Sequence, residues 1–478
     1  MSLRRHIARV RLALGVGVAL ATAPARADGV ATAPPPPPDL PQPARAMTMA
    51  EALDYAHEHQ PAIHAGISRV AARVAEAAIP SGQWLPTVAV TGQLYGMTTN
   101  NTTGTYLSTE FMDMPRIGGT PAVSQSTASL SPSPASLVGA GLLQEVFDFG
   151  RIGAQRAAAD ELVTVATHRA AVARLDVDFG VEEAYFAVLA AKAIILASDQ
   201  AYERSRIHRD LAKRGVDSGL RSPIELTRAE ADLARFDVGR VKARGGLALS
   251  QAVLAASIGS SEAAIDTSSE VPRLSDMPTM AQAIQQVEAR DPLLAAALAE
   301  LRAAEQHTRA VGAELRPDLS LTATVTGRAG GAQSSGNAPI PSGNGWLPDV
   351  PNWDVGLVLS WPLFDGTLSA RHDAARAQER VRRDEMDVTR LQEVAKVREA
   401  YVQVGVARSA LAALDSAVVA ARANYDQADA RFRAGIGNAV ELADAEALRI
   451  DAEIQQALGQ FELARARAAF GRAIAEGL

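Results

Sequence analysis

Side chains that could carry out catalysis or hold a metal are few and scattered in this sequence. The eight histidines form no cluster, no serine stands in a strand-to-helix elbow motif, and no glycine-rich loop has the phosphate-binding pattern. The absence of cysteine excludes disulfides, thiolate metal sites, nucleophilic thiols and a lipid-bearing cysteine. We therefore predict that the protein is not an enzyme and that it has no catalytic residue, no cofactor and no metal.

Two small groups of residues do have the types and spacing of metal ligands. His57 and His64 are seven residues apart in a predicted helix and would share one face. Met97, Met112 and Met114 would supply soft ligands from a loop. Exposed helical histidines and ordinary loop methionines explain both patterns without a metal, and this is the interpretation we prefer.

Two glutamates follow glycine-containing turns that end long predicted helices. Ser222 precedes Glu225 by three residues, and Asn438 precedes Glu441 by the same spacing. Both pairs fit a capping box, in which the glutamate side chain binds the backbone amide of the residue that caps the helix. Capping is therefore the simplest role for both glutamates.

The N-terminus has the pattern of an export signal. Residues 1–27 combine a run of arginines, an apolar segment at 12–20 and the small-x-small sequence Ala25-Arg26-Ala27. The apolar segment is shorter than the about 20 residues needed to cross a bilayer. Proline-rich chain follows, which disfavours helix and central strand. We expect a signal peptide at 1–27 and an extended leader at 28–46.

Charge and hydropathy limit what the remaining chain can do. The formal net charge is −7, and without the five arginines of the signal segment 42 basic residues face 54 acidic ones, a net charge of −12. This balance disfavours nucleic acid as a partner. Beyond residue 27 no uninterrupted apolar stretch of about 18 residues occurs, so we expect membrane insertion by strands rather than by helices.

The chain contains two copies of one pattern. Thr48–Leu53 returns as Thr279–Ile284, and Glu183–Tyr185 returns as Glu399–Tyr401. Each copy reads helix, strand, variable loop, strand, long helix, tight turn and helix. We predict an internal duplication, with repeats at 47–260 and 279–478 joined by a linker at 261–278.

Two strands are predicted in each copy. Residues alternate between apolar and polar over 319–328 and 353–363, and Trp353 and Trp361 bracket one apolar face as a membrane girdle. Four strands cannot close a barrel, and an open edge is not stable in lipid, so several chains must share one barrel. Three copies would give 12 strands. The alternative is a small soluble sheet. The strands of the first copy are predicted at 87–94 and 137–147.

Each copy also contains a very long helix. No proline occurs between Gly366 and Arg433, and roughly 65 residues at about 1.5 Å each give a helix near 100 Å in length. The segment after Gly150 behaves similarly. Such helices are stable only beside others, with alanine, valine and leucine seams buried as in a coiled coil. We expect a tube of packed helices.

Together these features resemble the TolC-type outer-membrane efflux protein family over about residues 46–476. The duplication, the strand pairs and the helix lengths agree in order, and so do the four motifs that follow the strands and the turns. The motifs lie at Phe147–Gly150, Phe364–Gly366, Ser222–Leu226 and Asn438–Leu442.

The resemblance implies an α+β membrane protein that forms a homotrimer in the outer membrane. Each protomer would contribute four strands to a 12-stranded barrel that continues into a coiled-coil periplasmic tunnel. The channel would be the passive exit duct of a tripartite efflux or type I secretion system. Its partners would be a periplasmic adaptor, an inner-membrane pump and outer-membrane lipid.

The resemblance also assigns candidate residues at the periplasmic end. Acidic gate positions match Glu225, Glu441 and Asp444, whose like charges would favour cations at the mouth. Phe432 and Gly437 stand where family members with a well-defined closed gate carry a tyrosine and an arginine, and Arg221 is the candidate replacement for that arginine. The candidate adaptor-docking turns comprise Gly215, Gly219, Ser222, Pro223, Gly435, Gly437 and Asn438.

Two other classes of protein compete with this interpretation. A soluble periplasmic coiled-coil adaptor or interaction protein also pairs helical hairpins with sheet, but it would usually lack the duplication and the tryptophan-bracketed strands. A periplasmic enzyme would need convergent polar residues in a pocket, which the sequence does not offer. The cargo, the identity of pump and adaptor, and the resting state of the periplasmic end stay open.

Overall fold

The computed structural model describes residues 42–43, 45–98, 108–109, 112–113, 132–268, 277–330 and 350–476. The predicted signal peptide and most of the predicted leader lie outside these residues, as do Met114 and most of the two loops between paired strands. Pro41–Leu478 forms one unit, and the description below concerns that unit.

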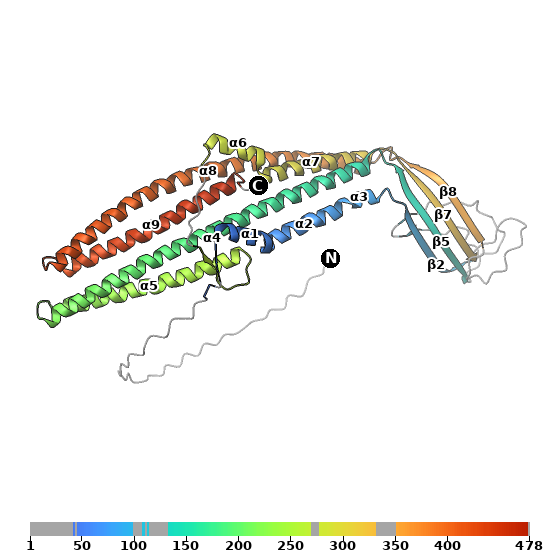
Figure 1. The fold of residues 1–478 in the computed structure, drawn as a ribbon. Helices are drawn as coiled ribbons and strands as arrows, with labels where there is room; N and C mark the ends of the chain where they lie inside the picture. The colour runs from blue at the N-terminus through green and yellow to red at the C-terminus, as the bar shows by residue number, and fades with distance from the viewer. Residues whose placement is uncertain are drawn as a thin grey trace, which may run out of the picture. The chain divides into compact units, whose positions relative to one another are not determined.

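Four long strands form one antiparallel sheet at one end of the unit (Figure 1). The order is β2-β5-β7-β8, so consecutive strands of each copy are neighbours and β5 pairs with β7 across the two copies. Among the described strands, β2 and β8 each pair on one side only. A short hairpin of β3 (Ser108–Thr109) and β4 (Met112–Asp113) lies between β2 and β5 in sequence. The strands are β2 (Thr87–Thr98), β5 (Pro132–Phe147), β7 (Asp318–Gly330) and β8 (Val350–Ser360).

The two faces of this sheet differ in polarity. Trp353 pairs with Val325, and both side chains are exposed, at 77% and 62%. On the other face Thr322 and Thr324 are buried, and the Thr324 hydroxyl donates a hydrogen bond to Asp354. The predicted alternation therefore places an apolar surface on one side of the sheet. Its other exposed members include Val88, Val90, Leu94, Val355, Leu357, Leu359 and, just beyond β8, Trp361.

Two helical hairpins extend from the sheet. The long helices α4 (Arg151–Asp217) and α8 (Gly366–Arg433) have 67 and 68 residues, which corresponds to about 100 Å each. Their return helices α5 (Pro223–Ser257) and α9 (Ala439–Ala473) have 35 residues each. Asp365 caps α8 by accepting hydrogen bonds from the amides of Thr367 and Leu368. Prolines are absent from the interior of α4 and α8, as the sequence analysis predicted.

Shorter helices complete the layer between the hairpins and the sheet. Near the sheet, α2, α4, α7 and α8 lie side by side in that order (Figure 1). Thr48 and Thr279 each form a capping box with the residue three positions later, so the repeated sequence produces the same local structure twice. The short helices are α1 (Met49–His59), α2 (Pro61–Ala77), α3 (Ile79–Gly82), α6 (Met280–Arg290) and α7 (Pro292–Ala313).

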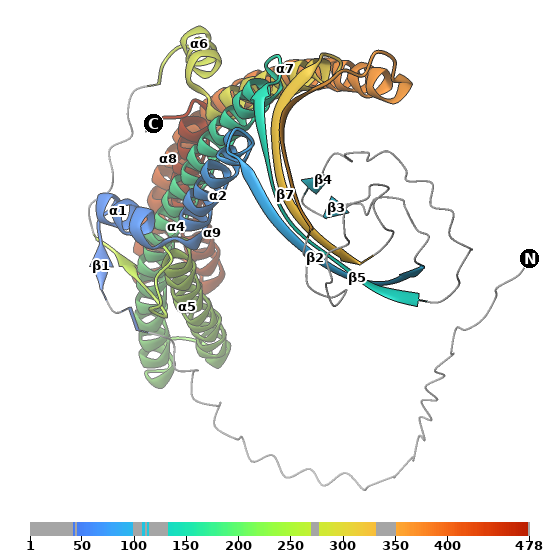
Figure 2. The same ribbon diagram turned by 90° about the vertical axis from the view of Figure 1, so that its right-hand side faces the viewer.

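A small parallel sheet that the sequence analysis did not predict joins the leader to the linker. β1 (Ala46–Met47) pairs with β6 (Asp266–Thr267) beside the largest buried cluster, in which Tyr185 and Ile265 are fully buried. Figure 2 shows α1 and α6 on one side of the unit and the sheet curving with its concave side facing away from them. We call that side the concave face.

The hydropathy of α8 departs from the sequence expectation. An 18-residue window of this helix reaches a mean hydropathy of 1.5, so by length and composition α8 could cross a membrane, and only 17% of the window is buried. The absence of an uninterrupted apolar run therefore does not by itself exclude a helical span on length and composition. The apolar part of α8 is rich in alanine and is interrupted by Arg408 and Asp415, so its mean hydropathy is high without a continuous apolar run.

Candidate functional site

The turns of the two hairpins meet at the end of the unit farthest from the sheet (Figure 1). Gly219 and Gly435 each follow the end of a long helix with a positive φ, 72° and 76°. Only glycine adopts this backbone conformation without strain, which explains the glycine in each turn. The predicted docking residues thus lie in or directly beside two exposed turns. We call this region the tip.

Two of the predicted docking glycines have packing reasons for being glycine. A Cβ at position 215 would lie 2.6 Å from Cδ of Arg221, and a Cβ at 437 would lie 2.9 Å from the backbone nitrogen of Phe432. An added side chain at either position would displace a neighbour. Gly437 therefore allows the second turn to close tightly over the end of α8.

The predicted capping boxes are not formed as expected. Ser222 makes no side-chain capping hydrogen bond, whereas the Asn438 side chain accepts one from the amide of Glu441. The two glutamates bind arginines instead. Glu225 pairs with Arg221 at 3.0 Å and Glu441 pairs with Arg431 at 3.3 Å. A guanidinium within reach competes with the cap amide because both partners of the arginine–glutamate bond are charged, whereas the amide is neutral.

Arg221 joins the two hairpins. Its Nη2 donates a hydrogen bond to the backbone carbonyl of Phe432 at 3.2 Å, and its guanidinium lies 3.9 Å from the centre of the Phe432 ring. The geometry is that of a cation–π contact combined with a hydrogen bond. From the sequence, Arg221 is the candidate replacement for a missing arginine, and in the structure it contacts Phe432.

Phe432 is also the centre of a small apolar core at the tip. Its side chain is 2% exposed and packs with Tyr425, Leu442 and Ala445, and Leu211 of the first hairpin lies against the same cluster. Residues from both hairpins therefore share one buried core. In the sequence Phe432 stands out only as a departure from a family pattern, which does not predict its burial.

A polar layer lies under this apolar core and was not predicted. Arg204 of α4 binds Glu446 of α9, with Nη2 and Oε1 2.9 Å apart, and the Glu446 side chain is 3% exposed. Nε2 of His208 lies 2.9 Å from the hydroxyl of Tyr425. The signal in the sequence was weak, because single charged residues in long helices usually lie on the solvent side.

Burial changes the proton affinity of this layer. It lowers the pKa of His208, with the nearby charges of Arg433 and Arg204 acting in the same direction and Asp429 opposing. Burial raises the pKa of Glu446, against the hydrogen bond from Arg204, and raises the pKa of Tyr425 to about 12. Tyr425 therefore keeps its hydroxyl proton at neutral pH, and His208 is neutral there.

The three acidic gate candidates differ in their surroundings. Glu225 and Glu441 are half-buried and paired, whereas Asp444 is exposed and has no ion pair with another described residue. The mutual repulsion expected from all three is thus reduced at two of them. Asp444 is the candidate that leaves its charge available to solutes.

Metal ligands are not grouped in the described part of the chain. No set of three or more histidine, cysteine, aspartate or glutamate residues there has the geometry to hold an ion. His57 contacts Asp178 at 2.5 Å and His64 contacts the carbonyl of Glu58, so the two rings have separate partners.

Solved structures share this architecture over most of the chain. The outer-membrane channel OprN has a TM-score of 0.71 and 19% identity, with 91% of this chain and 94% of that chain covered. The CmeC outer-membrane channel of Campylobacter jejuni has a TM-score of 0.71 and 15% identity, with 90% and 86% covered. At these identities the likeness establishes the fold alone, which this chain shares with those two proteins.

The sequence comparison defines the family. The model of the outer membrane efflux protein family matches residues 52–260 and 283–476. The chain belongs to this family, a family of outer-membrane transport proteins. Protein CyaE of Bordetella pertussis is 28% identical over 406 residues, which is 84% of this chain and 78% of that protein. The resemblance inferred from the sequence is confirmed, and with it the outer membrane as the location.

Proposed function

We propose that the chain is the channel subunit of a tripartite efflux or type I secretion system, in which it is a passive exit duct. The observation that carries this proposal is a sheet with one apolar face and two unpaired described edges, continued by paired helices of about 100 Å. An apolar sheet face suits lipid, and long paired helices suit a periplasmic wall.

Unpaired edges require a partner strand. Backbone amide and carbonyl groups on β2 and β8 would cost several kcal/mol each if left unpaired in lipid. Pairing of β2 with β8 of a second copy satisfies both edges, and three copies would close a barrel of 12 strands. Trp353 and Trp361 then lie on the lipid-facing side as girdle residues.

The tip is the proposed periplasmic gate. Arg221 and Phe432 hold the two hairpins together, and Asp444 supplies exposed negative charge beside them. Glu225 and Glu441 contribute through their arginine pairs. The glycine turns with Ser222, Pro223 and Asn438 form the exposed end that a periplasmic adaptor would contact, and an inner-membrane pump would deliver the cargo.

The proposal also covers removal of the signal peptide and the class of transported molecule. Residues 1–27 would be removed as a signal peptide, and no cysteine is available for a lipid anchor. A relative of 28% identity over 212 residues is named the fusaric acid resistance protein FusA of Burkholderia cepacia, and the present chain covers 38% of it. That name favours small organic molecules as one class of cargo.

Membrane fractionation of the full chain tests the proposal. We expect the protein in the outer-membrane fraction, with a heat-modifiable gel mobility and a detergent-solubilised mass of three protomers. A soluble periplasmic monomer would refute the channel and favour the coiled-coil interaction protein.

Ion selectivity in planar bilayers tests the gate. Asp444→Asn removes exposed charge at the tip, so we expect a lower preference for cations, measured as a shift in reversal potential under a salt gradient. Asp451→Asn is the matched control, since this exposed aspartate lies two turns farther along α9. Equal shifts for both variants would contradict a special role for Asp444.

A further inference from the structure

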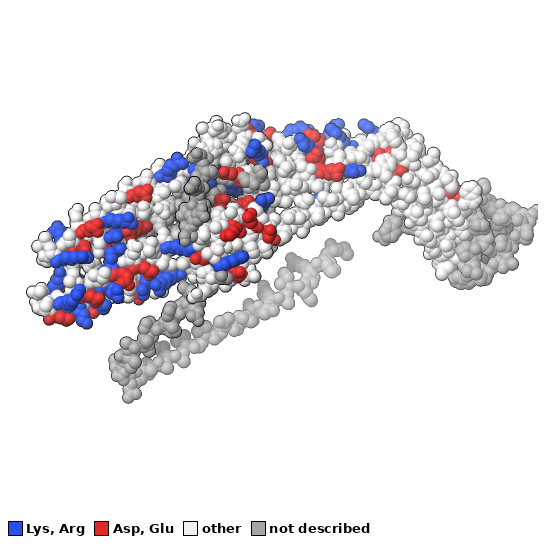
Figure 3. Space-filling model, viewed as in Figure 1, with Lys and Arg blue, Asp and Glu red and all other residues white. Residues whose placement is uncertain are grey.

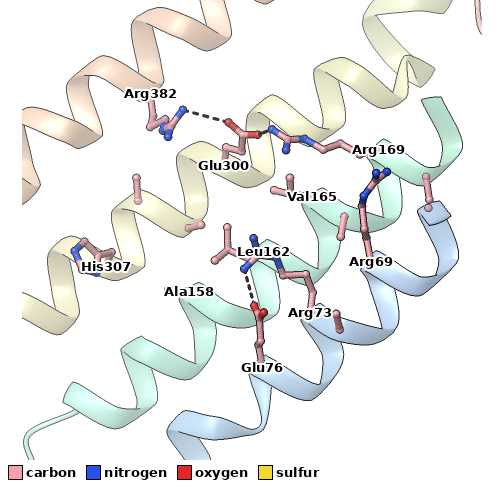
Figure 4. Close-up of a pocket in the computed structure, with 16 residues that line it drawn as sticks. Arg69, Arg73, Glu76, Ala158, Leu162, Val165, Arg169, Glu300, His307 and Arg382 are labelled. Carbon is pink, nitrogen blue, oxygen red and sulfur yellow. Dashed lines mark hydrogen bonds and ion pairs between the residues drawn. The ribbon is translucent and has the colours of Figure 1, made fainter. Parts of the chain in front are cut away.

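A pocket of about 830 Å³ lies in the helical layer near the sheet, far from the tip. Its residues come from α2, α4, α7 and α8 (Figure 4). In Figure 1, with the sheet on the right, these helices run from α8 at the top to α2 at the bottom. In Figure 4 the sheet ends of α2 and α4 point to the lower left, and α8 lies at the upper left. The two figures therefore view opposite faces of the helical layer, and Figure 4 views it from the side of the concave face (Figure 2).

Small side chains form the floor of the pocket. Gly66 is buried where α2 meets α4, and a Cβ at this position would lie 3.3 Å from Cβ of Ala170. Further alanines from α2, α4 and α7 continue the floor. Because these residues do not reach above the helix surface, the space over them stays open to a solute.

Arginines form the rim. Four arginines and two glutamates line the pocket, together with His307, so the lining carries an excess of positive charge in a chain whose net charge is −7. Figure 4 shows the four guanidinium groups arriving from three helices, Arg69 and Arg73 from α2, Arg169 from α4 and Arg382 from α8.

The glutamates satisfy only part of this charge. Glu300 lies between Arg169 and Arg382 and binds both, and Glu76 pairs with Arg73 at 2.6 Å. Arg382 also pairs with Glu385 of its own helix at 2.8 Å. Arg69 has no ion pair or hydrogen bond with any other described residue, and its side chain is exposed. A guanidinium offers five N–H donors, so the paired arginines also keep donors free for a further acceptor.

We propose that this pocket is an anion-binding site that takes phosphate or carboxylate groups of solutes moving along the concave face. Both groups match the planar donor fork of arginine, which binds two oxygens at once. In Figure 3 acidic and basic side chains intermingle on the opposite face, as expected for a solvated surface with local ion pairs. The pocket differs because four arginines from three helices gather over one cavity.

The role of this pocket in transport rests on the proposed channel function, whereas anion binding by the pocket does not. In a channel the pocket would raise the local concentration of anionic solutes partway along the wall. In a protein without channel activity it would still bind an anion.

Titration calorimetry on the full detergent-solubilised protein at low ionic strength tests the site, with inorganic pyrophosphate and citrate as probes. We expect saturable binding, and the tighter probe identifies phosphate or carboxylate as the preferred group. Arg69→Gln should weaken binding of the tighter-binding probe roughly tenfold, because the substitution removes the free charge-assisted donor. Arg302→Gln is the control, since it removes an exposed arginine of α7 outside the pocket.

The outcomes separate this inference from the proposed function. Absence of saturable binding of both probes, or equal weakening by Arg69→Gln and Arg302→Gln, overturns the site. In planar bilayers we expect Arg69→Gln, and not Arg302→Gln, to make the channel more cation-selective. If the protein forms no conducting channel, the proposed function fails, and the calorimetry still decides whether the pocket binds anions.

Discussion

The two turns of the tip have similar sequences but different contacts. Each has a glycine with positive φ, and each is followed three residues into the next helix by a glutamate that pairs with an arginine. In the first turn the arginine, Arg221, also reaches Phe432 of the other hairpin, and its side chain is 18% exposed. In the second turn Arg431 stays within its own hairpin and is 55% exposed.

The contacts that close one turn therefore differ from the contacts that hold the two hairpins together at the tip. The pair of Arg431 and Glu441 closes one turn, and an exposed pair of this kind contributes little to stability. The contacts of Arg221 with Phe432 hold two hairpins that are more than 200 residues apart in sequence. Changing either of these two side chains should therefore loosen the tip, while the ion pair of Arg204 with Glu446 still joins α4 to α9.

The largest effect is expected from Phe432→Ala. The substitution empties the centre of the apolar core shared by the hairpins, and buried phenylalanine to alanine changes cost about 3–5 kcal/mol. We expect amide hydrogen exchange to accelerate at the ends of both hairpins. Val440→Ala is the control, because this neighbouring side chain is 45% exposed. Acceleration confined to the second hairpin would show that the core does not couple the two.

The sequence predicted those parts of the fold that depend on local periodicity and on the positions of proline and glycine. The absence of proline between Gly366 and Arg433 gave the bounds of α8, and alternation gave β7 and β8. The pairing of β1 with β6 has no such signal, because strands of two residues have no period. Their pairing depends on how the middle of the chain folds.

The candidate site was predictable only where one turn determines the geometry. Glycines with positive φ could be assigned from the turns themselves. The pairing of Arg204 with Glu446 and the burial of Phe432 depend on how one hairpin packs against the other, and no spacing within one helix encodes that. The capping role given to Glu225 was wrong because Arg221, four residues before it, competes for the carboxylate.

A smaller effect is expected when the two arginines of the turns are exchanged for methionine one at a time. Arg221→Met removes a hydrogen bond and a cation–π contact that are partly shielded from water, so we expect a loss of about 1–3 kcal/mol at the tip. Arg431→Met removes an exposed pair and should cost at most about 0.5 kcal/mol. The measurement is again hydrogen exchange at both hairpin ends.

Conductance measurements compare the same two arginine variants in a second way. If the link of Arg221 to Phe432 restrains the proposed gate, Arg221→Met channels should open more often in planar bilayers than Arg431→Met channels. Equal behaviour of the two variants would mean that the hairpins are held by the apolar core and the layer beneath it, with Arg221 adding nothing.

The smallest effect is expected from the pH dependence of His208, which lies below the turns. Its pKa is lowered in the folded protein by burial, so its contribution to stability is complete above the unfolded value of about 6.5 and is lost as the pH falls through the folded pKa. Protonation would place a cation beside Arg204 and Arg433, with Asp429 as the one opposing charge and Tyr425 as a neutral neighbour. It would also leave a proton on the buried Nδ1, which has no hydrogen-bond partner among the described residues.

Hydrogen exchange at the tip should therefore accelerate between about pH 7 and about pH 5 in the wild type and much less in His208→Gln. Glu446 remains in both proteins and works in the opposite direction, because its raised pKa favours the fold at low pH, so the difference between the two proteins isolates His208. The same acceleration in both would assign the pH dependence to another group. Loss of the dependence in the variant would assign it to His208, the side chain of the first hairpin that contacts Tyr425 of the second.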